Sequence, residues 1–181
     1  MEFINDAFLI GSKIYLRAFQ SGDEEMISRL ENHPDPRSTL FYAFPVTTEQ
    51  IHQKTSRYLS DPNTIIFTIC NTEQDSAVGQ VALFRIDWVG RMATFYIGIA
   101  DKSNWSKGYG SEATMLLLRY AFDTLNLNRV QLHVAVENEA AVKVYKKCGF
   151  VQEGTLRQAM FHDGHYSDFY IMGILKHEFK K

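Results

Sequence analysis

The sequence predicts a mixed α/β (α+β) fold on one twisted sheet, with elements in the order β-α-α-β-β-β-α-β-α-β-β. Strand-like runs at residues 64–70, 77–86 and 92–100 follow one another across short polar breaks, which is typical of antiparallel neighbours. A strand, a turn, a helix and a strand come next, and such a β-α-β unit indicates a parallel pair. We therefore expect a mixed sheet, antiparallel in front and parallel around the central helix.

Length and composition are those of one globular domain. The chain has 181 residues, of which 45% are hydrophobic and 22% charged. These values are ordinary for a folded chain with a sizeable core. We expect a single domain over residues 1–181, with its core at about residues 10–178.

The first half of the chain alternates between clear and ambiguous signals. Residues 13–18 alternate in polarity and predict a strand. The patterns Ser21-Gly22-Asp23-Glu24 and Thr47-Thr48-Glu49-Gln50 resemble capping boxes, and each precedes apolar residues at helical spacing. Residues 32–45 hold three of the four prolines together with aromatic residues, so this segment is predicted to be a loop.

The second half is more regular. Residues 114–125 are apolar on most sides, which indicates a heavily buried helix. A strand at 129–136 and a helix at 139–147 follow, and Gly149 is suited to end that helix. Strands at about 151–159 and 166–175 flank Asp163-Gly164, a dipeptide typical of tight hairpins.

The most informative stretch is Asn104-Trp105-Ser106-Lys107-Gly108-Tyr109-Gly110-Ser111-Glu112-Ala113, between a strand and a helix. Unpaired backbone N–H groups at a positive helix end suit a phosphate or pyrophosphate. The stretch also fits a Gly-x-Gly-x-x-Ala dinucleotide fingerprint, but Glu137 lies well beyond the usual spacing of about 20 residues and too little chain follows it. A helix start that merely needs glycines is the third interpretation, and no Walker A motif is present.

A second constellation is the segment Asn-x-x-Ala-x-x-x-Tyr-x-x-x-Gly-Phe, which begins at Asn138. Asn138 alone is explained as a helix N-cap. Tyr145 shares an apolar helix face with Ala141 and Cys148, so a core tyrosine is its default interpretation. The alternative is a phenol placed to donate a proton.

Taken together, the two constellations resemble the GCN5-related N-acetyltransferases (GNAT), whose order of elements is the same. Similarity is greatest to the branch of ribosomal-protein N-terminal acetyltransferases and spermidine acetyltransferase. The branch-level features are Ile14-Tyr15-Leu16-Arg17, Trp105–Gly110, Leu125-Asn126-Leu127-Asn128-Arg129-Val130, Gly154-Thr155-Leu156-Arg157 and Asp163-Gly164-His165-Tyr166 with Asp168.

The resemblance implies that acetyl-CoA, as co-substrate, gives its acetyl group to a primary amine by direct attack in a ternary complex. The pyrophosphate would be bound by the amides of Lys107, Gly108, Tyr109, Gly110 and Ser111. The pantetheine arm would pair with Ile97, Gly98 and Ile99 and contact Asn138, and Tyr145 would protonate the departing thiolate.

The acceptor is open at this point. A protein N-terminus or a small amine is expected, and the alternatives are a polyamine or diamine, an amine-bearing antibiotic, or a non-catalytic sensor of acyl-CoA. Trp105 stands three residues before Gly108, where members of the family usually have Gln or Arg. Thr94 stands at a position where members of the spermidine branch can carry a carboxylate. Residues 40–45 are aromatic where a polyamine site would need acidic side chains, and this favours a peptide or apolar amine.

The general base is likewise unassigned. At pH 7 an amine with a pKa near 10 is mostly protonated, so a group must take its proton before attack. The candidates are Glu31, His33, Asp35, Asp87 and Tyr96, or a chain of water molecules.

Several classes of partner are not expected. A net charge of −2 gives no indication of nucleic acid, and no apolar run has the length of a membrane span. His162 and His165 straddle a turn without further ligands, so no metal is expected. Cys70 and Cys148 form no CxxC motif, which favours a reducing cytoplasm. The resemblance also raises the possibility of a homodimer.

Overall fold

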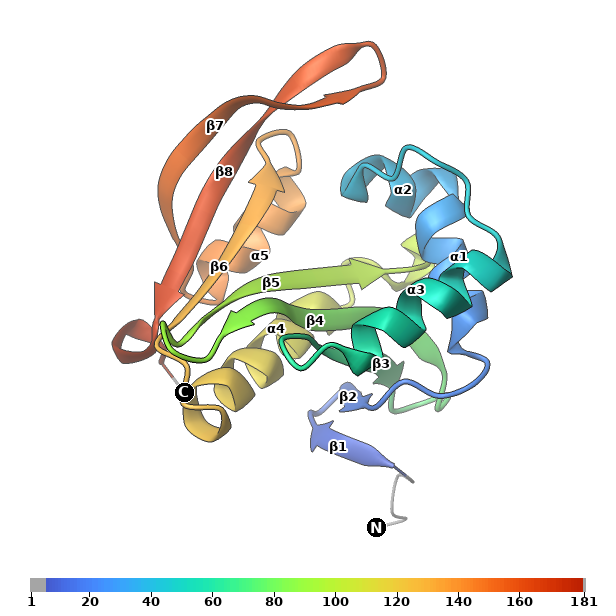
Figure 1. Cartoon of the computed structure of the whole chain (residues 1–181), viewed down its shortest axis with the longest axis horizontal. Coiled ribbons are helices and arrows are strands. Elements are labelled where there is room, and N and C mark those ends of the chain that lie inside the picture. The colour runs from blue at the N-terminus through green and yellow to red at the C-terminus, as the bar shows by residue number, and fades with distance from the viewer. Residues whose placement is uncertain (1–5, 181) are drawn as a thin grey trace.

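The computed structural model describes residues 6–180, which form one eight-stranded sheet with helices on both faces (Figure 1). The strands are β1 (Ala7–Ile10), β2 (Ile14–Arg17), β3 (Ile65–Asn71), β4 (Ala77–Asp87), β5 (Met92–Ile99), β6 (Arg129–Ala135), β7 (Val151–His162) and β8 (His165–Leu175). The α-helices are α1 (Asp23–Asn32), α2 (Pro34–Leu40), α3 (Thr48–Ser60), α4 (Tyr109–Arg119) and α5 (Glu139–Lys147).

The strand order is β1-β2-β3-β4-β5-β6-β8-β7, and neighbouring strands are antiparallel except for β5 and β6. The exception arises because α4 connects β5 to β6, and such a crossover returns the chain in the same direction. The prediction of a mixed sheet with one parallel region is confirmed. Strand β7 lies at the edge and forms a long hairpin with β8 that projects from the rest of the sheet (Figure 1).

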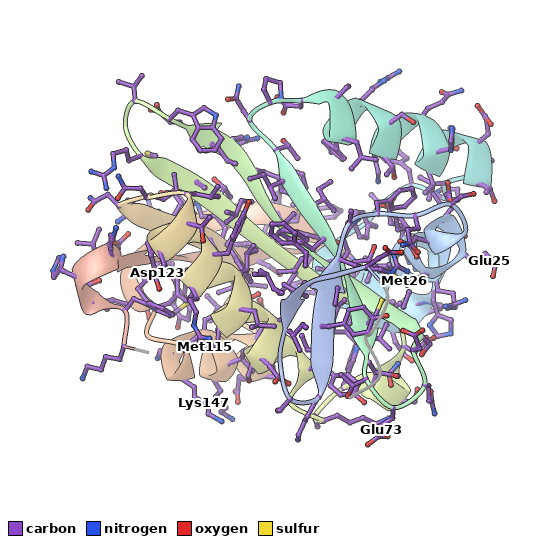
Figure 2. The ribbon with its side chains drawn as sticks, turned by 90° about the horizontal axis from the view of Figure 1, so that it is seen from below. Glu25, Met26, Glu73, Met115, Asp123 and Lys147 are labelled. Atoms are coloured by element: carbon purple, nitrogen blue, oxygen red, sulfur yellow. The ribbon has the colours of Figure 1, made fainter. Side chains whose placement is uncertain are left out.

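Two apolar clusters lie on opposite faces of the sheet, because successive side chains of β5 alternate between them. Phe95 and Ile97 belong to the larger cluster, which α4 covers, whereas Tyr96 packs against the smaller cluster beneath α1. Figure 2 labels Met115 of α4 and Met26 of α1. The sheet therefore separates the layer formed by α4 and α5 from the layer formed by α1, α2 and α3.

Of the two predicted capping boxes, one is present in the structure and the other is not. Thr47 caps α3 and Gln50 returns the bond, so this capping box is confirmed. The prediction for Ser21 is wrong, because α1 is capped by Gly22 in a left-handed conformation with no side-chain cap bond. The carboxylate of Asp23 instead holds Arg17 of β2 at 2.7 Å, which ties the helix start to the sheet.

The predicted loop at residues 32–45 contains a helix, α2. Proline is compatible with the first helical turn, where its missing N–H has no intrahelical partner, and Pro34 occupies that position. His33 acts as the cap by accepting a hydrogen bond from the Asp35 amide at 3.4 Å. The prolines therefore mark the beginning of a helix here, and the prediction of an unstructured segment is wrong over Pro34–Leu40.

Two further elements, β1 and α4, differ from expectation. Strand β1 was not predicted, because four residues with alternating exposure give a weak signal. Helix α4 begins at Tyr109 and continues after Arg119 into a π-helical turn, Tyr120–Thr124. The final hairpin is confirmed: Asp163 and Gly164 both have positive φ, as a two-residue turn of this type requires.

Candidate active site

The site is created by the divergence of β5 and β6. The two strands pair only at Met92, Ala93 and Thr94, whereas β5 stays paired with β4 as far as Ile99. Beyond Thr94 the outer edge of β5 faces a cavity of about 690 Å³, and residues 132–135 of β6 form the opposite wall. An unpaired strand edge inside a cavity offers backbone donors and acceptors to an extended ligand.

Trp105 shows which backbone groups of β5 face the cavity. Its indole Nε1 donates a hydrogen bond to the Ile99 carbonyl at 3.2 Å, so this carbonyl points away from β4. Alternation along the strand directs the backbone groups of Ile97 and Phe95 the same way. The backbone groups of Gly98 point toward β4, and a Cβ at Gly98 would lie 2.8 Å from Leu30 of α1. Gly98 is therefore required for close packing of α1 on β5.

The N-terminus of α4 forms one end of the cavity. Gly108 caps the helix with φ 91°, and no side chain bonds to the first-turn amides. Gly110 and Ser111 line the cavity there, and a Cβ built on Gly110 would have no neighbour within 4 Å. The glycine thus leaves open space beside unpaired N–H groups, which is the arrangement that binds phosphate at helix N-termini.

Glu112, the one acidic residue of this first turn, is turned away from the cavity. Its carboxylate accepts hydrogen bonds from the Ser12 hydroxyl at 2.9 Å and the Lys13 amide at 3.1 Å. These bonds fix the β1–β2 turn against α4 and bring the Lys13 ammonium to the Lys107 carbonyl, 3.1 Å away. Because Lys13 lies so far from the glycine turn in sequence, the motif alone could not identify it.

Further positive charge comes from α5. Lys143 and Lys147 line the same cavity, and Figure 2 shows Lys147 at the periphery of the molecule. The Lys143 ammonium lies 3.4 Å from the Glu139 carboxylate, which offsets part of its charge, whereas Lys147 adds positive charge to the cavity wall. This end of the cavity therefore suits a ligand with several phosphate groups.

Asn138 is the N-cap of α5, and Tyr145 lies in the last turn of that helix. The Asn138 side-chain oxygen accepts a hydrogen bond from the Ala141 amide at 3.2 Å, so its capping role is confirmed. Asn138 also lines the cavity, where its amide NH₂ remains as a donor.

The Tyr145 ring packs edge-on against Phe95, at 6.0 Å between ring centroids, and Phe150, at 5.8 Å. Its hydroxyl has no hydrogen-bond partner within residues 6–180, and the residue lines the cavity. Burial raises the pKa of Tyr145 well above its usual value, and the nearby Cys148 thiol raises it further. The phenol therefore stays protonated at neutral pH, as a proton donor must.

The structure brings the predicted site residues together around this one cavity. Lys107 does not line the cavity, and its carbonyl instead accepts a hydrogen bond from the Lys13 ammonium. The predicted residues that do line the cavity are Ile97, Gly98, Ile99, Gly108, Tyr109, Gly110, Ser111, Asn138 and Tyr145.

The opposite end of the cavity is apolar and was not predicted in detail. Leu40 and Phe41 at the end of α2 face Phe169 of β8 across it. The Phe41 ring lies 5.3 Å from that of Phe169 and 4.9 Å from that of His162, so α2 and the β7–β8 hairpin meet there. Among the described residues that line the cavity, none is Asp or Glu.

The candidate bases are dispersed. His33 and Asp35 lie at the exposed start of α2, and Asp87 lies at the distal end of β4, where it accepts a hydrogen bond from the Gly90 amide at 2.8 Å. Glu31 is buried in α1, outside the main cavity. Tyr96 alone among these candidates lines the main cavity.

Other possible chemistries receive no support from the described residues. Burial raises the pKa of the Cys148 thiol to about 11, which disfavours the thiolate that a nucleophile would need. Residues 6–180 contain no group of three or more His, Cys, Asp or Glu side chains placed to hold a metal ion. Over the same range, no helix is both long and apolar enough to cross a membrane.

Comparison with known proteins agrees with this geometry. The acetyltransferase (GNAT) domain family matches residues 13–151. Spermidine N(1)-acetyltransferase of Vibrio cholerae is 33% identical over 170 residues, which cover 94% of this chain and 97% of that protein. The Bacillus subtilis protein YdaF, named provisionally as a ribosomal N-acetyltransferase, is 29% identical over 178 residues, which cover 94% of this chain and 96% of that protein.

A solved structure is similar over the same span. The crystal structure of the Vibrio cholerae spermidine N-acetyltransferase in complex with CoA and spermine superposes with a TM-score of 0.85 at 33% identity, covering 93% of this chain and 98% of that one. The overall fold is thus shared with a protein whose crystal structure contains CoA. The chain belongs to the GCN5-related N-acetyltransferase family and is an acetyl-CoA-dependent N-acetyltransferase.

Proposed function

We propose that the acceptor is a primary amine on an apolar or peptide-like skeleton, such as a protein N-terminus or a small amine. The observation that carries the proposal is the apolar acceptor end, where Leu40, Phe41 and Phe169 surround the cavity without a carboxylate. A polycation would leave its distal ammonium groups unpaired against such walls, and this costs free energy.

The proposed chemistry is direct attack of the amine on the thioester. The amides at the start of α4, with Lys13 nearby, would bind the pyrophosphate, and the edge of β5 at Ile97 and Ile99 would hold the pantetheine arm. Asn138 would donate from its free amide. The Tyr145 hydroxyl would protonate the departing thiolate, because it is protonated, unpartnered and at the cavity wall.

Polyamine acetylation is the second candidate. It is favoured by the 33% identity to the Vibrio cholerae spermidine N(1)-acetyltransferase over nearly the whole chain. Against it stand Thr94, which carries no charge, and the apolar walls described above. The two candidates predict opposite orders of acceptor preference.

An acceptor panel separates them. CoA thiol release would be measured with a short peptide bearing a free N-terminus, spermidine and an aminoglycoside at equal concentrations. We expect the peptide to have the highest specificity constant. If spermidine has the highest value, the polyamine candidate replaces ours, and binding of acetyl-CoA without turnover of any amine would indicate a sensor.

Two properties of the whole protein complete the proposal. Cytoplasmic localisation is supported by Cys70 and Cys148, which are both buried free thiols.

A homodimer is supported by the β7–β8 hairpin, whose exposed apolar side chains include Leu156, Met160 and Phe161. Sedimentation of the full chain would measure its oligomeric state.

A further inference from the structure

A second cavity lies on the α1 side of the sheet and has no role in the chemistry described so far. Its volume is about 220 Å³, and its lining includes Glu31, Tyr42, Lys54, Tyr58, Gln80 and Tyr96. Several water molecules of about 30 Å³ each fit such a volume, and the lining offers the polar partners that they need.

Tyr96 connects the two cavities, since it lines both. Its hydroxyl lies 2.8 Å from the hydroxyl of Tyr42, a hydrogen bond in which either oxygen can be the donor. Tyr42 lines the second cavity and, in the part of the chain that the structure describes, not the first. The two phenols therefore form a continuous pair of hydroxyls between the amine-binding side and the second cavity.

A carboxylate and an outlet to solvent lie beyond this pair. The Glu31 side chain is 5% exposed and bonds to the ammonium of Lys54, which is partly exposed and also lies 5.6 Å from the centre of the Tyr42 ring. The charged and titratable groups around the pair are Glu31 from α1, Lys54 and Tyr58 from α3, and Tyr145 from α5. No other anionic side chain lines the second cavity within residues 6–180.

Electrostatics keep both phenols neutral. Burial raises the pKa of Tyr42 to about 12, and the negative charge of Glu31 contributes to the rise. Burial likewise raises the pKa of Tyr96, helped by Tyr42, Glu31 and Tyr145. Neither tyrosine can act as a phenolate base at neutral pH, but a neutral hydroxyl can accept one proton while it releases another.

We propose that Tyr96 and Tyr42 form a proton relay that carries the proton of the acceptor ammonium from the active site to Glu31 through water in the second cavity. The inference deepens the proposed function, since it requires the amine to reach Tyr96.

The transfer balances without any added reagent. An N–H bond of the ammonium breaks and its proton moves to the Tyr96 oxygen, while the proton of Tyr96 moves to Tyr42. The proton of Tyr42 passes to water and then to the Glu31 carboxylate, so both phenols end neutral. The amine keeps the electron pair with which it attacks the thioester, and Glu31 returns the proton to solvent past Lys54.

The pH dependence of kcat/KM for an alkylamine acceptor with a pKa near 10 tests the relay. Without the relay, only amine that is already neutral in solution can react. The rate for Tyr42→Phe should then rise about tenfold per pH unit between pH 7 and 9, toward the wild-type value. Near pH 7 the loss should be about 10²-fold, within the usual range for acid–base catalysis. Tyr96→Phe should behave in the same way.

Tyr58→Phe is the matched control, because it removes a hydroxyl from the second cavity without touching the pair. Its pH profile should follow that of the wild type. If Tyr42→Phe lowers kcat/KM by the same factor at every pH, the pair has only a packing role and the relay is refuted. Turnover by the wild type in the same assay keeps this outcome distinct from a failure of the proposed function.

Discussion

The two ends of the active-site cavity are built differently. The end at α4 and β5 presents mainly backbone: the first-turn amides after Gly108 and the open strand edge at Ile97 and Ile99. The end at α2 presents side chains, with Phe41 and Phe169 brought together from distant parts of the chain. Backbone recognition suits a ligand common to a whole family, whereas side chains can change to suit different acceptors.

The proposed proton donor and the proposed proton relay also lie on different sides of the site. Tyr145 lies on the α5 side, among the aromatic residues Phe95 and Phe150, and is placed to give a proton. Tyr96 and Tyr42 lie toward α1 and are placed to take one away. In the proposed mechanism, one reaction uses the two faces of the sheet for opposite proton transfers.

The largest effect is expected at Tyr145. Phenylalanine keeps the ring contacts, so Tyr145→Phe should lower kcat by at least tenfold, and up to about 10²–10⁴-fold, with little change in acetyl-CoA affinity. Because burial raises the pKa of Tyr145, its proton is present throughout neutral and mildly alkaline pH and is lost only above the usual phenol range. Wild-type activity should therefore show no loss from this group below about pH 10.

Steady-state kinetics and a thermal melt check this prediction together. A normal kcat in the variant would return Tyr145 to a core tyrosine.

The next largest effect should separate the backbone end from the side-chain end. A valine at Gly110 would fill the open space beside the α4 amides, so Gly110→Val should weaken acetyl-CoA binding about tenfold or more, or roughly 1.4 kcal/mol. The melting temperature should change little, because a Cβ at Gly110 has no neighbour within 4 Å. Calorimetric titration with acetyl-CoA measures the affinity, and an unchanged value would remove the phosphate site from this turn.

A substitution at the acceptor end should affect binding of the acceptor and leave binding of acetyl-CoA unchanged. Phe41 has φ 57°, and asparagine tolerates this left-handed conformation, so Phe41→Asn preserves the backbone while it removes the ring. We expect KM for the acceptor to rise about tenfold from the lost apolar contact, with KM for acetyl-CoA unchanged. Equal increases in both KM values would show that the two ends do not act separately.

The smallest effect is expected at Lys13. Its ammonium is at the surface and screened by solvent, so Lys13→Ala should raise KM for acetyl-CoA only about two- to threefold. The effect should shrink at high ionic strength. Lys176→Ala is a suitable control, since Lys176 bonds to Asn126, away from the cavity. A salt-independent change would mean that Lys13 acts through the β1–β2 turn.

The backbone end could be predicted from sequence because local spacing determines it. Two glycines between a strand and a helix, and Asn138 with Tyr145 seven residues later, keep their geometry within single elements. The fold class followed from the same local patterns, since the runs of strands and the β-α-β unit are contiguous in sequence.

The aromatic character of residues 40–45 could be predicted for the side-chain end, but its arrangement could not, because it depends on long-range packing. The pairing of Phe41 with Phe169, and of Tyr42 with Tyr96, requires the position of α2 against the sheet. The prolines at positions 34 and 36 predict a loop, so the expected fold does not contain α2, the helix that Phe41 directly follows. Lys13 could not be predicted for a related reason: the carboxylate of Glu112 brings its turn to the α4 end of the cavity.

Residue-resolved amide hydrogen exchange, with and without CoA, tests directly whether the edge of β5 and the start of α4 bind the cofactor. We expect slower exchange on CoA binding for the amides of Ile97, Ile99 and the α4 N-terminus, Tyr109–Ser111. The amide of Gly98, which points toward β4, and those of the β7–β8 turn should be unchanged. Protection elsewhere, with Ile97, Ile99 and the α4 N-terminus unaffected, would contradict the account.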